Sequence, residues 1–246
     1  MICVSETLQS PEVTLTGYIW SDSAEMATAA VRPAVLIFPG GGYQFCSDRE
    51  AEPIALAYMA EGYNAFVLRY SVGGSDFEQP FGDAEDAIRM LHERADEWHI
   101  ASDKIAVVGF SAGGHLAAML AATGKIRPAA VVLGYPAILS KLGEALGKYL
   151  PGADERVDST MPPTFVFSTW SDDVVPIENS LMLANALDKA KVPCELHIFE
   201  RGEHGLSLAK PMTANGSQEM VNPAVAQWFK LSVDWLKSWL GDFPVA

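Results

Sequence analysis

The sequence predicts an α/β protein built on a mainly parallel sheet that helices cover on both faces. Short apolar runs alternate with longer amphipathic runs from Ala34 onward, which is typical of strands that alternate with helices. The run Ala34–Phe38 is apolar throughout, as expected for a strand buried on both faces. Such an alternation favours parallel strands joined by helical crossovers.

The individual elements follow from the spacing of the apolar residues. The predicted strands are Val13–Trp20, Ala34–Phe38, Ala65–Tyr70, Lys104–Phe110, Ala129–Tyr135, Thr164–Thr169 and Glu195–Phe199. The predicted helices are Pro53–Met59, Asp83–Trp98, Ala112–Ala122, Glu178–Ala190 and Ala224–Leu240. No repeat, low-complexity tract or linker divides the 246 residues, so a single domain is expected over residues 1–246.

The composition narrows the classes of partner. The chain carries 31 acidic residues against 17 basic ones, a formal net charge of −14. Nucleic acids and anionic membranes bind basic surfaces, so neither is expected as a partner. The apolar stretches are short and interrupted, which predicts no transmembrane helix.

The three cysteines, Cys3, Cys46 and Cys194, are scattered and show no zinc-type spacing. The protein is therefore expected in the cytoplasm, with its cysteines reduced. Residues 1–10 lack the pattern of a secretory signal, although a signal removed beforehand is compatible with the same sequence. Neither a metal nor an organic cofactor is expected, and the oligomeric state is left open.

A candidate nucleophile follows the strand Lys104–Phe110 directly. The residues Gly109-Phe110-Ser111-Ala112-Gly113 form a G-x-S-x-G motif between a predicted strand and a predicted helix. Glycines two residues on either side of Ser111 allow the sharp turn that exposes its hydroxyl. The following helix directs its amide dipoles toward developing negative charge.

A glycine-rich loop, Pro39-Gly40-Gly41-Gly42-Tyr43, follows the strand Ala34–Phe38. Its amides could bind the oxyanion of a tetrahedral intermediate, where each donor contributes a few kcal/mol. A phosphate-binding loop is the alternative, but that loop would need a lysine and a helix start in fixed register. We therefore expect an oxyanion hole built from the amides of Gly41, Gly42 and Ala112.

A serine nucleophile needs a general base, which is normally a histidine held by a carboxylate. The chain has five histidines, His92, His99, His115, His197 and His204. His204 alone follows a predicted strand within a flexible loop, and it comes late in the chain, as the Ser…Asp…His order that accompanies a G-x-S-x-G elbow requires. His115 is expected to pack beneath the elbow.

The acid is expected just after the strand Thr164–Thr169, where Asp172 and Asp173 are adjacent. Either side chain can reach a histidine loop on the neighbouring strand. Spacing alone does not choose between them.

Several motifs resemble the small carbohydrate esterases of the α/β-hydrolase superfamily, often labelled acetyl xylan esterase-like or bifunctional acetyl/feruloyl esterases. They are Pro39–Tyr43, Ser47–Pro53, Gly109–His115 and Asp172–Ser180, and the similarity runs on to the closing helix with Trp228 and Trp235. In that family the acid stands four residues before the proline of a D-x-x-V-P element, which implies Asp172. The resemblance also implies hydrolysis of acetate or hydroxycinnamate esters on xylan-type polysaccharide.

The substrate site is expected to be open. The segment Pro136–Pro163 is short for a lid, so the fold class is an α/β-hydrolase fold with little or no lid domain. Four aromatic residues near strand ends are candidates for contact with sugar or aromatic acyl groups: Tyr43, Phe45, Tyr135 and Trp170. Asp48, Arg49 and Glu50 are interpreted as a helix start with an ion pair that holds the glycine loop.

These residues together predict a serine carboxylic-ester hydrolase acting on small-molecule or oligosaccharide esters. A general carboxylesterase or a small serine peptidase uses the same three residues, so both remain alternatives. A non-catalytic carbohydrate-binding homologue is the alternative outside enzymes, and it would be expected to carry a damaged triad or glycine loop.

Overall fold

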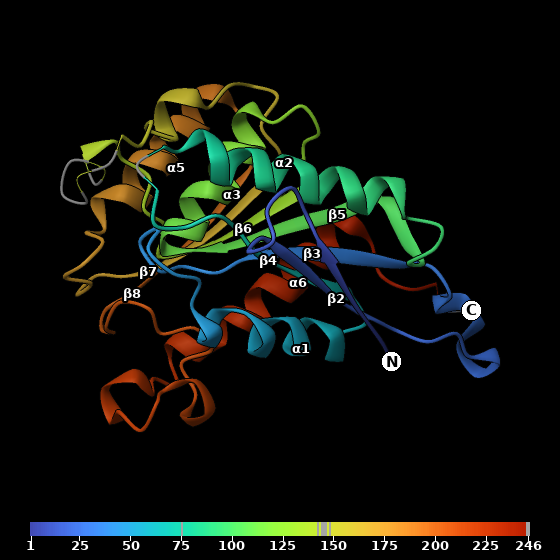
Figure 1. The fold of residues 1–246 in the computed structure, drawn as a ribbon. Helices are drawn as coiled ribbons and strands as arrows, with labels where there is room; N and C mark the ends of the chain where they lie inside the picture. Colours follow the sequence, from blue (N-terminus) through green and yellow to red (C-terminus); the bar gives the residue numbers. More distant parts are fainter. Residues whose placement is uncertain (75, 142, 144–146, 148, 245–246) are drawn as a thin grey trace.

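The computed structural model describes residues 1–74, 76–141, 143, 147 and 149–244. Its centre is an eight-stranded sheet with the strand order β1-β2-β4-β3-β5-β6-β7-β8 (Figure 1). The strands are β1 (Ile2–Thr7), β2 (Thr14–Ile19), β3 (Arg32–Phe38), β4 (Asn64–Arg69), β5 (Ile100–Phe110), β6 (Ala130–Gly134), β7 (Thr164–Thr169) and β8 (Cys194–Phe199). β1 and β2 are antiparallel at one edge, and the strands from β4 to β8 are parallel.

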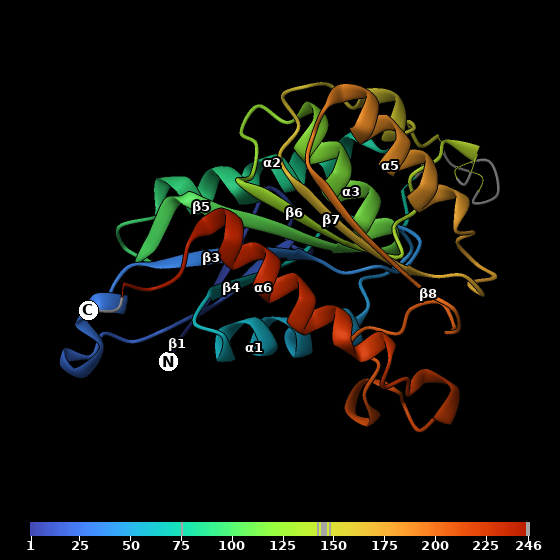
Figure 2. The same cartoon turned by 180° about the vertical axis from the view of Figure 1, so that it is seen from behind.

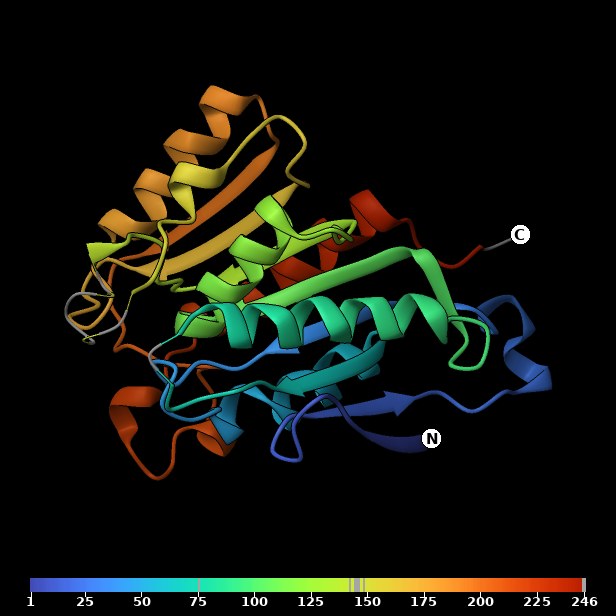
Figure 3. The ribbon, with the colours of Figure 1, turned by 45° about the horizontal axis from the view of Figure 1, so that its top comes forward.

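Helices cover both faces of this sheet, as predicted. The helices are α1 (Glu52–Ala60), α2 (Glu78–Glu93), α3 (Ser111–Thr123), α5 (Glu178–Ala190) and α6 (Trp228–Leu240). α2, α3 and α5 lie on one face and share a hydrophobic core with it (Figures 1 and 3). α1 and α6 pack on the opposite face around a second core, which is visible from behind in Figure 2. None of these described helices is long and apolar enough to cross a bilayer.

β5 starts four residues earlier than predicted and α6 four residues later, and the largest differences from the sequence-based prediction are at β1 and α2. β1 was not predicted, because this edge strand is mostly exposed and lacks an apolar run. α2 covers Glu78–Glu93 instead of Asp83–Trp98. It starts earlier because Pro80 is tolerated in a first helical turn. It ends earlier because the chain turns after Glu93. The buried Trp98 lies in that turn and packs against Phe66, so it continues the apolar spacing of the helix beyond its end.

The register of the sheet places the candidate residues at one edge. Phe38 at the end of β3 pairs with Gly109 of β5, so the glycine loop and the serine elbow leave the sheet at the same level. On the far side, Thr169 at the end of β7 pairs with Phe199 at the end of β8. The carboxyl ends of parallel strands form the usual ligand-binding edge of such sheets.

Trp228 anchors the segment that returns from this edge to α6. Its ring stacks on Phe167 with a centroid separation of 4.4 Å and lies 5.7 Å from Phe110. Its indole nitrogen donates a hydrogen bond to the carbonyl oxygen of Ser207, at 2.9 Å. The first residue of α6 therefore supports both the sheet and the loop that contains His204.

We predict that Trp228→Ala lowers the free energy of unfolding by about 3 to 5 kcal/mol, because it leaves a large cavity and removes a buried hydrogen bond. Chemical denaturation monitored by circular dichroism measures this loss. Trp239→Ala is the matched control, since Trp239 is on the same helix but about half exposed, and it should cost less than about 1 kcal/mol. Equal losses from the two variants would contradict the prediction.

Candidate active site

Ser111 occupies a strained turn between β5 and α3. Its φ angle is 51°, in the left-handed region that a residue with a side chain rarely adopts. Close packing makes this turn possible. A Cβ on Gly113 would lie 2.0 Å from the carbonyl oxygen of Phe38, and one on Gly109 would lie 2.3 Å from that of Gly113. Both motif glycines are therefore required by backbone contacts.

Ser111, His204 and Asp172 form a continuous chain of hydrogen bonds. The hydroxyl of Ser111 lies 2.8 Å from Nε2 of His204, and Nδ1 of His204 lies 2.7 Å from Oδ2 of Asp172. The other Asp172 oxygen accepts the amides of Val174 and Val175, which fixes the orientation of the carboxylate. The Asp172 side chain is almost fully buried, whereas Asp173 is exposed. The structure thus brings Asp172, and not its neighbour, to the histidine.

The glycine loop stands beside the serine. Gly41 and Gly42 have φ angles of 129° and 61°, conformations that suit glycine. A Cβ on Gly41 would lie 2.0 Å from the carbonyl oxygen of Phe45, so the turn also needs the space. Within the described part of the chain, the amides of Gly41, Gly42 and Ala112 have no protein acceptor, and all three residues line the same cavity as Ser111. They can therefore donate to a ligand.

A cavity of about 830 Å³ opens above Ser111 and His204. Its remaining walls combine apolar side chains with polar groups. The apolar residues include Phe45, Ala137, Leu150, Val174, Val175 and Met212, and the polar ones include Ser47, Asp48, Arg49 and Asn215. Phe45 is 59% exposed at its rim. Ala137 and Leu150 belong to the segment predicted to be a reduced lid, of which residues 142, 144–146 and 148 lie outside the described residues.

The four candidate aromatic residues have different positions. Tyr43 and Phe45 line the cavity. Tyr135 is buried behind it, 2% exposed, and packs edge-on against the ring of His204 at a centroid distance of 5.1 Å. Trp170 is 62% exposed and is not part of the cavity wall. The expectation of substrate contact does not fit the placement of Tyr135 or Trp170.

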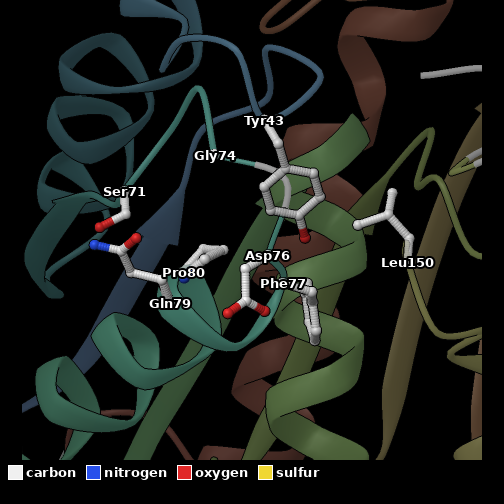
Figure 4. Close-up of a pocket in the computed structure, with 8 residues that line it drawn as sticks. All are labelled: Tyr43, Ser71, Gly74, Asp76, Phe77, Gln79, Pro80 and Leu150. Atoms are coloured by element: carbon white, nitrogen blue, oxygen red, sulfur yellow. The ribbon is translucent and has the colours of Figure 1, made fainter. Parts of the chain in front are cut away.

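A small pocket adjoins the main cavity and shares Tyr43 and Leu150 with it. Figure 4 shows the ring of Tyr43 pointing in among the residues that line this pocket, which also include Phe77 and Asp76. Its volume is about 10 Å³, close to that of one water site. This small pocket is therefore too small to hold a substrate-sized ligand.

His115 packs beneath the elbow. Its Nε2 donates to the carbonyl oxygen of Pro151 at 2.7 Å, so its Nδ1 accepts from the Tyr43 hydroxyl at 2.8 Å. Burial disfavours the charged ring and lowers the pKa of His115 to about 4. The histidine is thus a neutral hydrogen-bonding link between α3, the glycine loop and the residues before Ala153.

The turn Asp48–Glu50 connects to the site differently from the predicted ion pair. Asp48 pairs with Arg69 at 2.8 Å, and Arg49 donates to the carbonyl oxygen of Gly205 at 2.9 Å. Glu50 holds the glycine loop by accepting the amide of Gly40 at 2.8 Å. The sequence motif indicated contact with the glycine loop. It could not assign this contact to Glu50, because residue spacing does not determine where a side chain points.

Among the residues that the structure describes, no three His, Cys, Asp or Glu side chains come together as a metal-binding group. The groups that meet at this edge are a hydroxyl, an imidazole, a carboxylate and a set of backbone amides.

Comparison with known proteins agrees with an α/β-hydrolase fold. The BD-FAE family model matches residues 23–132, and the prolyl oligopeptidase family model matches residues 147–242. The crystal structure of MGS-M1, an α/β-hydrolase enzyme from a Medee basin deep-sea metagenome library, is 51% identical, covers 98% of each chain and superimposes with a TM-score of 0.93. The chain belongs to the α/β-hydrolase family.

Two further relatives have carbohydrate-ester descriptions. An acetyl ester-xyloside bifunctional hydrolase from Caldicellulosiruptor lactoaceticus is 35% identical, with 92% of this chain and 88% of that chain covered and a TM-score of 0.78. An acetylxylan esterase from Xylanibacter ruminicola is 29% identical over 70% of this chain and 40% of that protein. The resemblance to carbohydrate esterases is thereby confirmed. The chain spans only 33% and 40% of the length of the curated relatives that it matches.

The environment of His115 predicts acid sensitivity. The unfolded chain protonates this residue near pH 6.5, whereas the folded protein does so only near pH 4. The unfolded state therefore binds more protons between these values, and stability falls as the pH falls through this window. We expect this residue to account for a loss of about 2 to 3 kcal/mol in the free energy of unfolding between pH 7.5 and 4.5.

Denaturant titrations of the wild type and His115→Gln at both pH values measure this contribution. The variant should be less stable at pH 7.5 but lose less stability on acidification. An identical loss in both proteins would contradict the prediction.

Proposed function

We propose that the protein is a serine carboxylic-ester hydrolase that removes acetyl or feruloyl groups from xylan-type polysaccharide. The observation that carries the proposal is the hydrogen-bonded series Ser111–His204–Asp172, opening into a large cavity beside unpaired loop amides. A nucleophile, a base, an orienting acid and oxyanion donors are the parts that acyl transfer requires.

In the first half-reaction Ser111 attacks the ester carbonyl while His204 takes the hydroxyl proton. Asp172 holds His204 in the tautomer with Nδ1 protonated and stabilises the imidazolium that forms. The amides of Gly41, Gly42 and Ala112 bind the oxyanion, and the protonated histidine then passes its proton to the departing alcohol. Water attacks the acyl-enzyme by the same route, and the free acid leaves.

The proposed substrate class rests on the relatives and on the shape of the cavity. Acetylxylan esterase and acetyl ester-xyloside hydrolase are the descriptions of two relatives. The cavity of about 830 Å³ is much larger than an acetyl group, which leaves room for the sugar that carries it. Phe45 and Met212 at its wall offer apolar surface against which a sugar ring or an aromatic acyl group can pack.

A serine peptidase is the second candidate, because the prolyl oligopeptidase family model matches residues 147–242. This segment contains Asp172 and His204, which both reactions use in the same way. The match therefore supports a serine-hydrolase mechanism, but it does not favour an amide over an ester as the substrate. A peptide p-nitroanilide assay separates the two reactions, and ester hydrolysis should exceed amide hydrolysis.

Ser111→Ala should abolish hydrolysis of p-nitrophenyl acetate and covalent labelling by a fluorophosphonate, since both need the hydroxyl. Asp172→Asn should lower kcat by about 10³- to 10⁴-fold, because an amide stabilises neither the tautomer nor the imidazolium. Asp173→Asn is the matched control and should keep wild-type kinetics, because that side chain is exposed. Full activity in Ser111→Ala would exclude Ser111 as the nucleophile.

For the substrate, we expect kcat/KM for acetate release from acetylated xylo-oligosaccharides to exceed that for p-nitrophenyl acetate. The activated ester has the better leaving group, so a preference for the sugar ester requires binding energy from the sugar in the transition state. Acetate release followed by an enzyme-coupled assay gives both values. Turnover of the activated ester alone would leave a general esterase and remove the xylan assignment.

A further inference from the structure

Glu50 is a buried carboxylate at the back of the active site, and the mechanism above does not use it. Its side chain belongs to the turn Asp48–Glu50, and the residue is only 3% exposed. Within the described residues it forms no ion pair, and its partners are two hydrogen-bond donors. Burying a carboxylate without a paired cation is costly, so these two hydrogen bonds must compensate for lost hydration.

The first donor belongs to the glycine loop. The amide of Gly40 donates to Oε2 of Glu50 at 2.8 Å, on the residue that precedes the two candidate oxyanion donors. This contact is tight, since a Cβ on Gly40 would lie 2.7 Å from the same oxygen. Glu50 therefore fixes the start of the turn in which Gly41 and Gly42 present their amides to the cavity.

The second donor leads to the histidine loop. The hydroxyl of Tyr135 donates to Oε1 of Glu50 at 2.6 Å and accepts the amide of Ser207 at 2.9 Å. Ser207 lies three residues after His204, and the ring of Tyr135 packs against the imidazole itself. One carboxylate is thus connected through one phenol to the loop that carries the general base.

The preceding residue of the same turn strengthens this connection. Arg49 donates to the carbonyl oxygens of Gly205 and Thr213, and its own carbonyl oxygen accepts the hydroxyl of Ser207. The turn therefore contacts the histidine loop at three residues that follow His204. The glycine loop and the histidine loop follow β3 and β8, which are separated by three strands in the sheet, so the sheet alone does not join them.

We propose that Glu50 is a positioning residue that sets the oxyanion donors and the general base relative to each other. This inference rests on the proposed function. The donors act on charge that develops only in the transition state, so a displaced loop costs rate more than substrate affinity. Loss of the carboxylate should accordingly lower kcat and leave KM nearly unchanged.

Glu50→Gln is the sharpest variant, because it keeps the shape of the side chain but has a single acceptor oxygen. Gly40 and Tyr135 both donate, so one donor must then face the new amide NH₂ group. We expect kcat for p-nitrophenyl acetate to fall by about 10- to 100-fold, with KM changed by less than about threefold. Tyr135→Phe breaks only the link to the histidine loop and should give a smaller fall in kcat.

The affinity of a trifluoromethyl ketone inhibitor distinguishes positioning from a purely structural role, because loss of a purely structural contact would leave this affinity unchanged. The inhibitor forms a tetrahedral adduct with the serine hydroxyl, and its oxyanion occupies the site of the donors. Its affinity should fall by the same factor as kcat/KM in both variants. Glu52→Gln is the matched control, because Glu52 is two residues further on and pairs with Arg69 at 3.2 Å, outside the cavity wall.

A Glu50→Gln protein that unfolds more easily but keeps wild-type kcat and inhibitor affinity would overturn the proposal. If this variant does not fold, Tyr135→Phe decides: reduced kcat and inhibitor affinity support the positioning role, and wild-type values overturn it. Ser111→Ala is assayed alongside. Activity in that variant would refute the proposed function itself, whereas Ser111-dependent activity that is indifferent to Glu50 would refute only the positioning role.

Discussion

The close contact between the start of α3 and the end of β3 is the constraint on which the site depends. Gly113 lies against the carbonyl oxygens of Phe38 and Pro39, at a separation that no side chain could occupy. This contact allows the chain to turn at Ser111 with a positive φ angle. The strain of a non-glycine residue in this region costs of order 1 to 3 kcal/mol and persists only where the surroundings enforce it. Here the β3–β5 register and the two motif glycines enforce it.

The same contact determines the position of the proposed oxyanion donors. Because Phe38 pairs with Gly109, the chain that leaves β3 passes directly beside the elbow. The glycine loop and the N-terminus of α3 therefore line the same cavity as Ser111. The proposed donors come from segments about 70 residues apart in the sequence. The parallel sheet provides this proximity, and the buried polar contacts of Glu50, Tyr135 and His115 keep the loops from relaxing away from it.

The sequence was sufficient for the features that depend on local pattern. The alternation of apolar runs predicted the strands from β2 to β8, and the strand–turn–helix context of Gly109–Gly113 identified the elbow. β1 escaped prediction because an exposed edge strand has no buried face to impose a pattern. The choice between Asp172 and Asp173 could not be made from spacing, because adjacent residues differ only in direction. It followed from the resemblance, and in the structure the two amides behind Asp172 fix that direction.

The aromatic candidates also show that residue spacing does not determine the direction of a side chain. Tyr135 and Trp170 both follow strands at the correct edge, yet Tyr135 is buried behind the histidine, and Trp170 is exposed and does not line the cavity. A position at a strand end specifies the neighbourhood of a side chain and not its rotamer or its partner. For Tyr135 the partner was the informative feature, because the hydroxyl of a buried tyrosine usually has a hydrogen-bond partner and Glu50 is its acceptor here.

The proposed catalytic groups and the outermost side chains of the cavity wall differ in how exposed they are. Asp172, the proposed orienting acid, and Glu50, the proposed positioning residue, are both buried and held by hydrogen bonds. The cavity wall instead includes exposed, loosely constrained side chains such as Phe45 and Met212, both more than half exposed. Substitutions at the wall can change which ester fits without disturbing the proposed catalytic groups. Relatives with the same elbow can therefore act on different esters, and the substrate has to be argued from the cavity and not from the triad.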